Sequence, residues 1–198
     1  MQMSKDRQQE KARRSREKLL EAAGKLFSEK KISDVGVREI ASAAGCTTGT
    51  FYHYFTGKDD MIDQLYQDHD IEMGRLLHQW TQEQGPYCDK IRTFFAQTLS
   101  AAVLADGWEF TCYRIFQMRK HSDDRDRLYM GMQELIQKAI DAGELQTYAS
   151  AKEINGYLFV VFRGVLYEWC LCPPEQVFLL DERLKQMTGY ALQSFQKK

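Results

Sequence analysis

Hydroxyl, phenol and imidazole groups are crowded into residues 47–54, where the chain reads TTGTFYHY. Side chains of this kind, here Thr48, Tyr52 and His53, suit hydrogen bonds to base edges and phosphates and contacts with thymine methyl groups. Gly49 has no side chain, which allows the backbone to approach a groove closely. The first chemistry that these residue types suggest is therefore the recognition of double-stranded DNA.

A basic arm precedes this polar segment. Its cations are Lys11, Arg13, Arg14, Arg16 and Lys18. Positive charge at this density displaces counterions from DNA phosphates. A charge run of this kind is more often a solvated helix face, and Asp6, Glu10 and Glu17 dilute it. Its position just upstream of the polar segment is what favours a role in DNA binding.

Two short helices are needed to present the polar segment, and the sequence predicts both. Apolar residues recur with helical spacing over residues 37–44, and Gly45 then supplies the left-handed residue that ends a helix and turns the chain. Thr47 is expected to cap the next helix, which turns Phe51 and Phe55 inward. A helix–glycine–helix unit alone is common in α-helical proteins. Together with the basic arm and the polar segment, it predicts a helix-turn-helix.

Residues 16–61 resemble the DNA-binding domain of the tetracycline-repressor (TetR) family of bacterial regulators. The matching positions are Ala22-Ala23, Leu26-Phe27, Val37, Ile40-Ala41, Ala44-Gly45, Thr47, Gly49-Thr50, Tyr52, Phe55 and Lys58. Three positions depart from the family pattern, with Lys31 in place of glycine, Gly36 in place of threonine and Tyr54 in place of histidine. A glycine cap at Gly36 costs only about a few tenths of a kcal/mol relative to serine or threonine.

The resemblance implies that the helix after Gly45 enters the major groove. The residues that it assigns to DNA, with the capping threonine included, are Thr47, Thr48, Gly49, Thr50, Tyr52, His53 and Tyr54. Arg38 and Lys58 are expected to flank this helix, Arg38 within reach of a guanine. The resemblance also implies that residues from about 60 onward sense a ligand and form a dimer. We therefore expect a DNA-binding helix-turn-helix domain at residues 1–58 and a ligand-sensing and dimerisation domain at residues 59–198.

Helical periodicity recurs along the chain, and its three prolines leave long stretches free to be helical. No segment alternates apolar and polar residues over the length of a strand. The predicted fold is therefore all-α, with an N-terminal three-helix helix-turn-helix domain, a C-terminal helical domain and about nine helices. A long helix is expected from about Lys58 to Gln84, and later helices near residues 108–121, 124–142, 150–172 and 174–196.

The last two helices favour a homodimer. The final helix carries an apolar stripe at the 3–4 spacing of a packing seam, formed by Val177, Leu180, Leu184, Met187, Ala191 and Phe195. The preceding helix, residues 154–171, is apolar nearly all round. Burial within one chain is the alternative, but a two-fold interface of both helices explains the pattern better. A symmetric dimer also presents two reading helices about one DNA turn apart, as a palindromic operator requires.

Candidates for contact with a small-molecule effector are Phe94, Trp108, Cys112, Phe116, Phe159 and Arg163. Aromatic rings together with nearby methionines, among them Met118, Met130 and Met132, suit an adaptable apolar cavity. Ordinary core packing accounts for most of the same residues. Arg163 is a cation in the most apolar helix, and it either faces an anionic ligand group or pairs with an acidic residue such as Glu168 or Glu109.

Five cysteines without a paired CxxC spacing indicate reduced thiols in a cytosol. The Cys170-Leu171-Cys172 motif leaves a redox-, metal- or haem-responsive regulator as an alternative, and a ligand-free architectural DNA-binding protein as another. No metal ligand set or cofactor is predicted. The sequence has no GxSxG, P-loop, HExxH or Rossmann glycine motif, so an enzyme is not expected.

Charge divides the chain in the same way as the motifs. Residues 1–58 hold 12 Lys and Arg against 7 Asp and Glu, whereas residues 59–198 hold 15 against 21. No apolar run reaches the roughly 20 residues that cross a bilayer, and the N-terminus has no signal-peptide core. The resulting hypothesis is a cytoplasmic, homodimeric repressor, without a membrane partner, that a small apolar or aromatic effector releases from its operator DNA.

Overall fold

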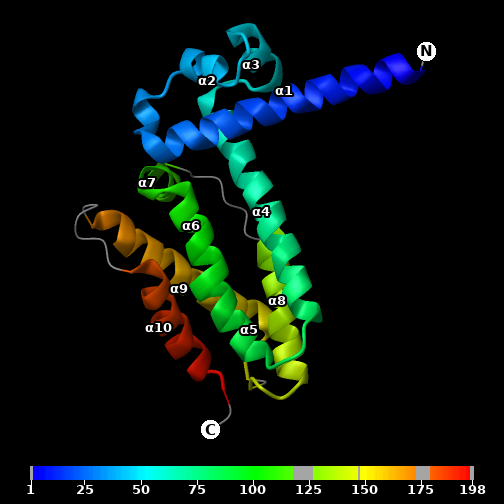
Figure 1. The fold of residues 1–198 in the computed structure, drawn as a ribbon. Helices are drawn as coiled ribbons and strands as arrows, with labels where there is room; N and C mark the ends of the chain where they lie inside the picture. The colour runs from blue at the N-terminus through cyan, green and yellow to red at the C-terminus, as the bar shows by residue number, and fades with distance from the viewer. Residues whose placement is uncertain (1, 118–126, 147, 173–178, 197–198) are drawn as a thin grey trace. The chain divides into compact units, whose positions relative to one another are not determined.

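A computed structural model describes residues 2–117, 127–146, 148–172 and 179–196 (Figure 1). All the regular elements in these ranges are helices, and the only strand-like pairing among them is an isolated bridge between Leu145 and Gln196. The chain divides into two compact units, Met1–Asp68 and His69–Lys198, which we call the N-terminal and C-terminal units. The prediction of an all-α fold is confirmed.

The N-terminal unit contains α1 (Gln2–Glu29), a 3-10 turn η1 (Ile32–Asp34), α2 (Val37–Ala43), α3 (Thr48–Tyr54) and the first turns of α4 (Lys58–Gln82). The C-terminal unit contains the rest of α4, then α5 (Tyr87–Thr93), a π-helical turn η2 (Phe94–Leu99), α6 (Ser100–Asp106), α7 (Trp108–Gln117), α8 (Arg127–Asp141), α9 (Ala151–Leu171) and α10 (Leu180–Gln193). Because α5, η2 and α6 follow one another without a break, the helices described here form nine continuous segments, as predicted.

The boundary between the units lies inside α4, at residues 68 and 69, instead of at the start of that helix. Met61 and Ile62 in its first turns are buried, and Nη2 of Arg16 on α1 donates to Oε1 of Gln64 at 2.6 Å. These contacts make the beginning of α4 part of the N-terminal unit. The sequence placed the boundary at residue 58 because the helix-turn-helix motif ends there.

Two apolar clusters fill the C-terminal unit. The larger core lies among α5, η2, α8 and α9, and it includes Phe94, Phe95, Tyr129, Met132, Leu158 and Phe159. The smaller core lies at the other end of α9, and it consists of Val103, Val165, Leu166, Trp169, Cys170, Leu180 and Leu184. Figure 1 shows α9 and α10 side by side, and their packing closes both cores on one side.

Carboxylates from distant elements cap two helices of this unit. Glu144 accepts hydrogen bonds from the backbone N–H groups of Tyr87 and Cys88 at 2.9 and 2.8 Å, at the start of α5. Asp70 on α4 accepts from the N–H groups of Arg127 and Leu128 at 2.8 and 3.2 Å, at the start of α8. Each carboxylate satisfies N–H groups that a helix start leaves without partners. The capped helices are thereby tied to α4 and to the segment after α8.

The apolar stripe predicted to form the dimer seam on the last helix faces the core of its own chain. Leu180, Leu184 and Ala191 are at most 5% exposed in the single chain, so they cannot face a partner. Met187 and Phe195 pack against the smaller and the larger core, and Val177 lies outside the described residues. The prediction was wrong for this stripe, because helical spacing reveals an apolar face without revealing what covers it. The predicted helix start at residue 174 and the residue Met118 also lie outside the described ranges.

No helix in the described part of the chain is both long enough and apolar enough to cross a membrane.

Candidate nucleic-acid interface

Two buried rings hold α3 in place. Phe51 is fully buried and Phe55 is 1% exposed, and their ring centroids lie 5.3 Å apart. Gly45 precedes the helix with a φ of 64°, in the left-handed region where glycine is favoured. The turn brings α3 back against α2, and the two helices form the predicted helix-turn-helix.

The threonines at the start of α3 are used within the chain. Oγ1 of Thr47 accepts a hydrogen bond from the Thr50 N–H at 3.1 Å, which confirms the predicted cap. The two threonine hydroxyl oxygens are also hydrogen-bonded to each other at 2.9 Å. Thr47 and Thr50 therefore set the start of α3, and Thr48 between them presents an exposed hydroxyl.

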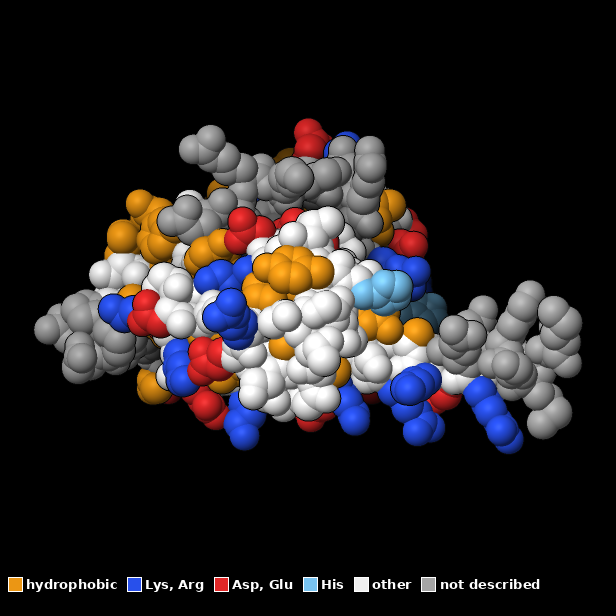
Figure 2. Space-filling model, turned by 90° about the horizontal axis from the view of Figure 1, so that it is seen from above, with side chains coloured by type: hydrophobic (Ala, Val, Ile, Leu, Met, Phe, Trp, Pro, Cys, Tyr) orange, Lys and Arg blue, Asp and Glu red, His pale blue; other side chains and the backbone are white. Residues whose placement is uncertain are grey.

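The outward face of α3 carries the polar groups that the sequence assigned to DNA. Tyr52 is 61% exposed, and Thr48, Gly49 and His53 are exposed as well. Tyr54 is half-buried, with its ring edge-on to His53 at a centroid distance of 4.8 Å. Figure 2 looks onto the side on which α2 and α3 lie, where backbone and uncharged side chains, with a hydrophobic and a histidine patch among them, are bordered by both basic and acidic side chains. Arg38, exposed at the start of α2, belongs to the same unit.

Gly49 is not required by the packing of the chain itself. A Cβ atom built there meets Oγ1 of Thr47 at 3.6 Å, which is an ordinary van der Waals distance. Its backbone is right-handed, so an alanine suits the conformation. In the interior of a helix, glycine costs up to about 1 kcal/mol relative to alanine, and no contact inside the chain explains why this helix carries a glycine in its first turn.

Lys58 has a role inside the N-terminal unit that the sequence did not indicate. Its Nζ atom donates to the carbonyl oxygens of Ile32 and Val35 at 2.5 and 3.1 Å, at the turn η1. An ammonium group has three N–H donors, so at most one remains for a phosphate. These carbonyls lie more than 20 residues away in sequence, so no local pattern could have revealed the contact.

A polar network connects α1 to the turn that follows α3. Arg16 donates to Gln64, and Nε2 of Gln64 donates to Oδ1 of Asp60 at 3.1 Å. Oδ2 of Asp60 accepts from the backbone N–H of Thr56 at 2.8 Å. The pKa of Asp60 is lowered, above all because the Thr56 N–H stabilises the charged carboxylate. The network fixes the chain between α3 and α4 and thereby the position of α3.

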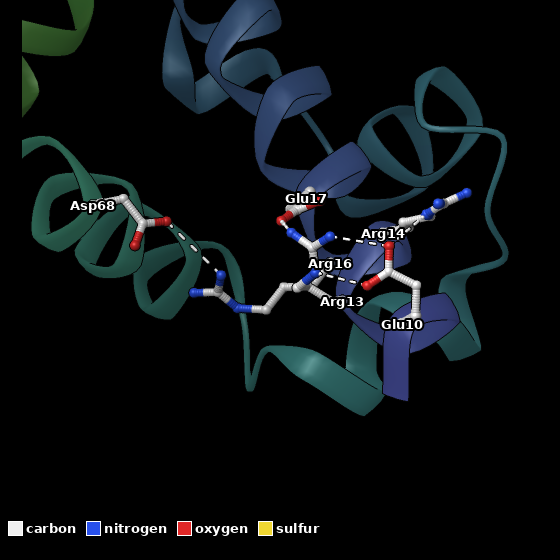
Figure 3. Close-up of polar contacts among 6 residues, drawn as sticks. All are labelled: Glu10, Arg13, Arg14, Arg16, Glu17 and Asp68. Carbon is white, nitrogen blue, oxygen red and sulfur yellow. Dashed lines mark hydrogen bonds and ion pairs between the residues drawn. The ribbon is translucent and has the colours of Figure 1, made fainter. Parts of the chain in front are cut away.

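Part of the basic arm is already paired within its own helix (Figure 3). Arg13 bonds to Glu10 at 3.0 Å and to Glu17 at 2.7 Å, and Arg14 bonds to Glu10 at 2.9 Å. Arg16 turns toward α4, with Nη1 at 3.8 Å from Oδ2 of Asp68. Lys11 and Lys18 are exposed and make no ion pair with a described residue.

The structure does not bring the six candidate effector residues together in one place. Phe94 and Phe159 belong to the larger core, whereas Trp108 and Cys112 pack against the smaller core. Nε1 of Trp108 donates to the Trp169 carbonyl at 3.4 Å, and the Cys112 thiol donates to the Cys170 carbonyl at 3.7 Å. Phe116 is 45% exposed against the ring of Tyr167, and Arg163 is half-buried on α9.

The described residues do not bring three or more His, Cys, Asp or Glu side chains together as a group that could hold a metal ion. Burial raises the pKa of the Cys112 thiol and the pKa of the Cys170 thiol, and it raises the pKa of Cys88 to about 11. Thiols of this kind react slowly near neutral pH, because the thiolate is the reactive form.

Residues 19–65 match the family model described as bacterial regulatory proteins of the tetR family. The HTH-type transcriptional regulator AcrR of Shigella flexneri is 23% identical over 200 residues, which cover 93% of this chain and 90% of that protein. The repressor KstR2 of Mycobacterium tuberculosis is 42% identical, but over 50 residues only, 25% of each protein. SmeT, the repressor of the Stenotrophomonas maltophilia multidrug efflux pump SmeDEF, has the same fold, with a TM-score of 0.73 and 18% identity over 92% of this chain and 91% of SmeT. SmeT is also known in a complex with triclosan.

Proposed function

We propose that the chain is a homodimeric, cytoplasmic repressor that binds a palindromic operator. It belongs to the TetR family of bacterial regulatory proteins. In the proposed function, the repressor leaves its operator when a small apolar or aromatic effector binds. The observation that carries the proposal is the outward face of α3. Thr48, Tyr52 and His53 are exposed there, while buried rings and a capped start fix the helix behind them. Rigid presentation of polar groups on a helix is what direct reading of a major groove requires.

A second copy of the chain fits an apolar stripe on the outer face of α9. Tyr157, Val160, Tyr167 and Leu171 are 48%, 60%, 50% and 61% exposed, and they follow a 3–4 spacing. Gly164 lies in the middle of the stripe, and a Cβ atom built there meets nothing within 4 Å. Large exposed apolar side chains in one row are typical of an interface, and a glycine among them allows close approach of another helix.

A neighbouring stripe on α10 continues this surface. Leu179 and Tyr190 are 65% and 60% exposed, and they border an open hollow along the helix. Glu168 on α9 and Arg183 on α10 form an ion pair at 3.2 Å, which shows that the two stripes are adjacent. We therefore propose that the dimer uses the outer faces of α9 and α10, and that on α10 this is a different face from the stripe predicted from the sequence.

Effector binding in the C-terminal unit would reach DNA through α4. This helix begins in the N-terminal unit and ends in the C-terminal unit. In the latter, Nδ1 of His69 on α4 lies 3.1 Å from Oδ1 of Asp106, whose Oδ2 lies 3.7 Å from Arg114 on α7. An effector that shifts α6 and α7 would therefore bias α4 as well. A coupling of about 1–3 kcal/mol would change operator affinity about 5- to 150-fold.

The test of DNA binding begins with selection of operators from random-sequence DNA by the full chain. We expect an enriched palindrome with half-sites about one helical turn apart. In gel shifts with that DNA, Tyr52→Ala should bind at least about fivefold more weakly, because a lost base or phosphate contact costs about 1–3 kcal/mol. Tyr148→Ala is the control, since Tyr148 is 63% exposed in the C-terminal unit. Selection without a two-fold motif, or wild-type affinity of Tyr52→Ala, would refute the proposal.

The proposed interface is tested separately by its oligomeric state. Val160→Glu places a charge on the α9 stripe without disturbing the core, so we expect a folded monomer in sedimentation experiments. Leu104→Glu is the matched control, because Leu104 is 52% exposed on α6 and lies outside both stripes. A dimeric Val160→Glu protein would place the interface elsewhere.

A further inference from the structure

The chain contains a single asparagine, and it is completely buried. Asn155 on α9 is 0% exposed, and its Nδ2 atom donates to the carbonyl oxygen of Tyr129 at 2.9 Å. This bond fixes the orientation of the amide, because the flipped amide would set Oδ1 against a carbonyl oxygen. Oδ1 is then left without a hydrogen-bond partner among the described residues.

An acceptor of this kind destabilises the protein as long as it has no donor. A buried polar atom without a partner costs about 1–3 kcal/mol, and few such atoms occur in native proteins. A leucine at this position would fill similar space in the apolar core without that cost. The retained amide is explained if a donor arrives from outside the chain.

Aromatic rings surround this part of α9. Phe159 and Phe162 follow Asn155 by one and two helical turns, so the three share one face of the helix. The ring of Phe159 lies 5.1 Å from that of Tyr129 and 5.6 Å from that of Phe95, which lies 5.7 Å from Phe162. We call Phe95, Tyr129, Phe159 and Phe162 the aromatic cluster. Phe162 also packs against the smaller core, so the cluster lies where the two cores meet.

The helix opposite α9 is irregular at the same place. Phe95 belongs to η2, the π-helical turn at Phe94–Leu99 in the continuous helix that α5, η2 and α6 form. A π-helical turn is less favourable than an α-helix, and such turns occur frequently at functional sites. Met73 and Trp80 are only partly buried beside the larger core, and methionine adapts readily to a new neighbour. Because the cluster is packed, a ring enters it only if these side chains move apart.

We propose that the aromatic cluster and Asn155 form the effector subsite, and that the subsite takes a planar aromatic molecule with a hydrogen-bond-donating group. The inference rests on the proposed function, since it names the class of effector. The rings of the cluster offer edges and faces to an aromatic molecule. Oδ1 of Asn155 only accepts, so the effector has to present a hydroxyl or a ring N–H. A carboxylate at that point would meet the negative end of the amide dipole.

The single asparagine makes a direct experiment possible. Labelling of the whole chain with [15N]asparagine gives one side-chain amide nitrogen resonance, which belongs to Asn155. We expect saturable movement of this signal with 2-naphthol, which donates a hydrogen bond. 2-Methoxynaphthalene has the same rings but no donor, and it should bind about tenfold more weakly, because one buried hydrogen bond is lost.

Variants separate the role of the amide from that of the fold. In Asn155→Leu, the affinities for the two naphthalenes should differ by less than about twofold, because no acceptor remains. Thr188→Val is the matched control and should keep the tenfold preference, since Thr188 is equally buried but bonds to Leu184 within its own helix. Circular dichroism confirms that each variant is folded. The wild-type titration decides the matter even if Asn155→Leu does not fold.

Equal affinity of the wild type for both compounds, an Asn155 signal that does not move, or no saturable binding of either compound would each overturn the inference. Equal affinity would mean that a buried water satisfies Oδ1. Gel shifts with the selected operator keep this outcome apart from the proposed function. If the protein binds DNA but fails the naphthol test, only the subsite is wrong. If naphthol binds at Asn155 but no DNA is bound, the proposed function fails and the subsite remains.

Discussion

Gly49→Ala should stabilise the N-terminal unit and weaken DNA binding at the same time. The added methyl group meets Oγ1 of Thr47 at 3.6 Å and nothing closer, so the chain accommodates it. Replacing a helical glycine should raise the free energy of unfolding by up to about 1 kcal/mol. The methyl group then projects from the face that carries Thr48 and Tyr52. If that face lies against DNA, the overpacked contact should cost about 1–3 kcal/mol, or about 5- to 150-fold in affinity.

Gly24→Ala is a matched control for this change. Gly24 is also helical, in α1, and a Cβ atom built there meets nothing within 4 Å. We expect Gly24→Ala to raise the midpoint of urea unfolding and to bind the selected operator with wild-type affinity. Only Gly49→Ala should combine higher stability with weaker binding in gel shifts.

Three results would refute this reasoning. Wild-type affinity of a stabilised Gly49→Ala protein would mean that the backbone of α3 does not approach DNA closely. A loss of stability would mean that the glycine serves the packing of the chain, contrary to the contact distances. A lower affinity that appears with Gly24→Ala as well would point to an indirect effect of helix stability.

Three further predictions concern the scaffold and the thiols. Lys58→Met should lower the free energy of unfolding by about 1–2 kcal/mol, because two carbonyls lose their donor. The same change should hardly alter the salt dependence of DNA binding. Unchanged stability together with a flatter salt dependence would contradict this prediction. Hydrogen bonding to the Thr56 N–H lowers the pKa of Asp60 in the folded protein. The ionised Asp60 carboxylate therefore stabilises the fold above the pKa of the unfolded state, and this stabilisation is lost as pH falls through the folded pKa. Asp60→Asn should therefore flatten the fall in melting temperature below about pH 4, and an unchanged pH profile would argue against this contribution. Cys88 and Cys170 should not react with iodoacetamide at pH 8 until the protein unfolds, because burial raises the pKa of each thiol, that of Cys88 to about 11. Rapid labelling of either cysteine, measured by mass spectrometry, would support a thiol switch instead.

The helix-turn-helix could be predicted because its signals are local. Gly45 ends one helix, and Thr47 caps the next helix by accepting a hydrogen bond from Thr50, three residues later. The two phenylalanines set the inward face of that helix. Each of these is a relation between residues at most a few positions apart. Local capping and periodicity are the terms that a single sequence exposes directly.

Contacts between distant residues could not be predicted in the same way. The bonds of Lys58 to η1 and of Arg16 to Gln64 join residues 26 and 48 positions apart. The stripe on α10 was recognised as apolar, but whether Leu184 meets its own core or a partner depends on the placement of α9 beside it. The orphaned oxygen of Asn155 is likewise visible only once Tyr129 is placed beside it.

The net positive charge of the DNA-binding part is smaller when its boundary is taken from the structure. The N-terminal unit extends to Asp68 and so includes four more acidic residues, which leaves 12 Lys and Arg against 11 Asp and Glu. Arg13 and Arg14 are paired with carboxylates within α1. If such an arginine turns to a phosphate instead, the carboxylate that it leaves attracts a cation from solution. Affinity for DNA phosphates must then come from the placement of a few cations and not from net charge.

The salt dependence of operator binding measures how many cations act. Lys11, Lys18 and Arg38 are the exposed candidates without an ion pair to a described residue. If these three cations each contact a phosphate in both halves of a dimer, a plot of log affinity against log salt concentration has a slope of about −5. The full basic arm with Arg38 and Lys58 would give about −13. A slope near the steeper value would show that the intrahelical pairs open on DNA and that the arm binds as one positive surface.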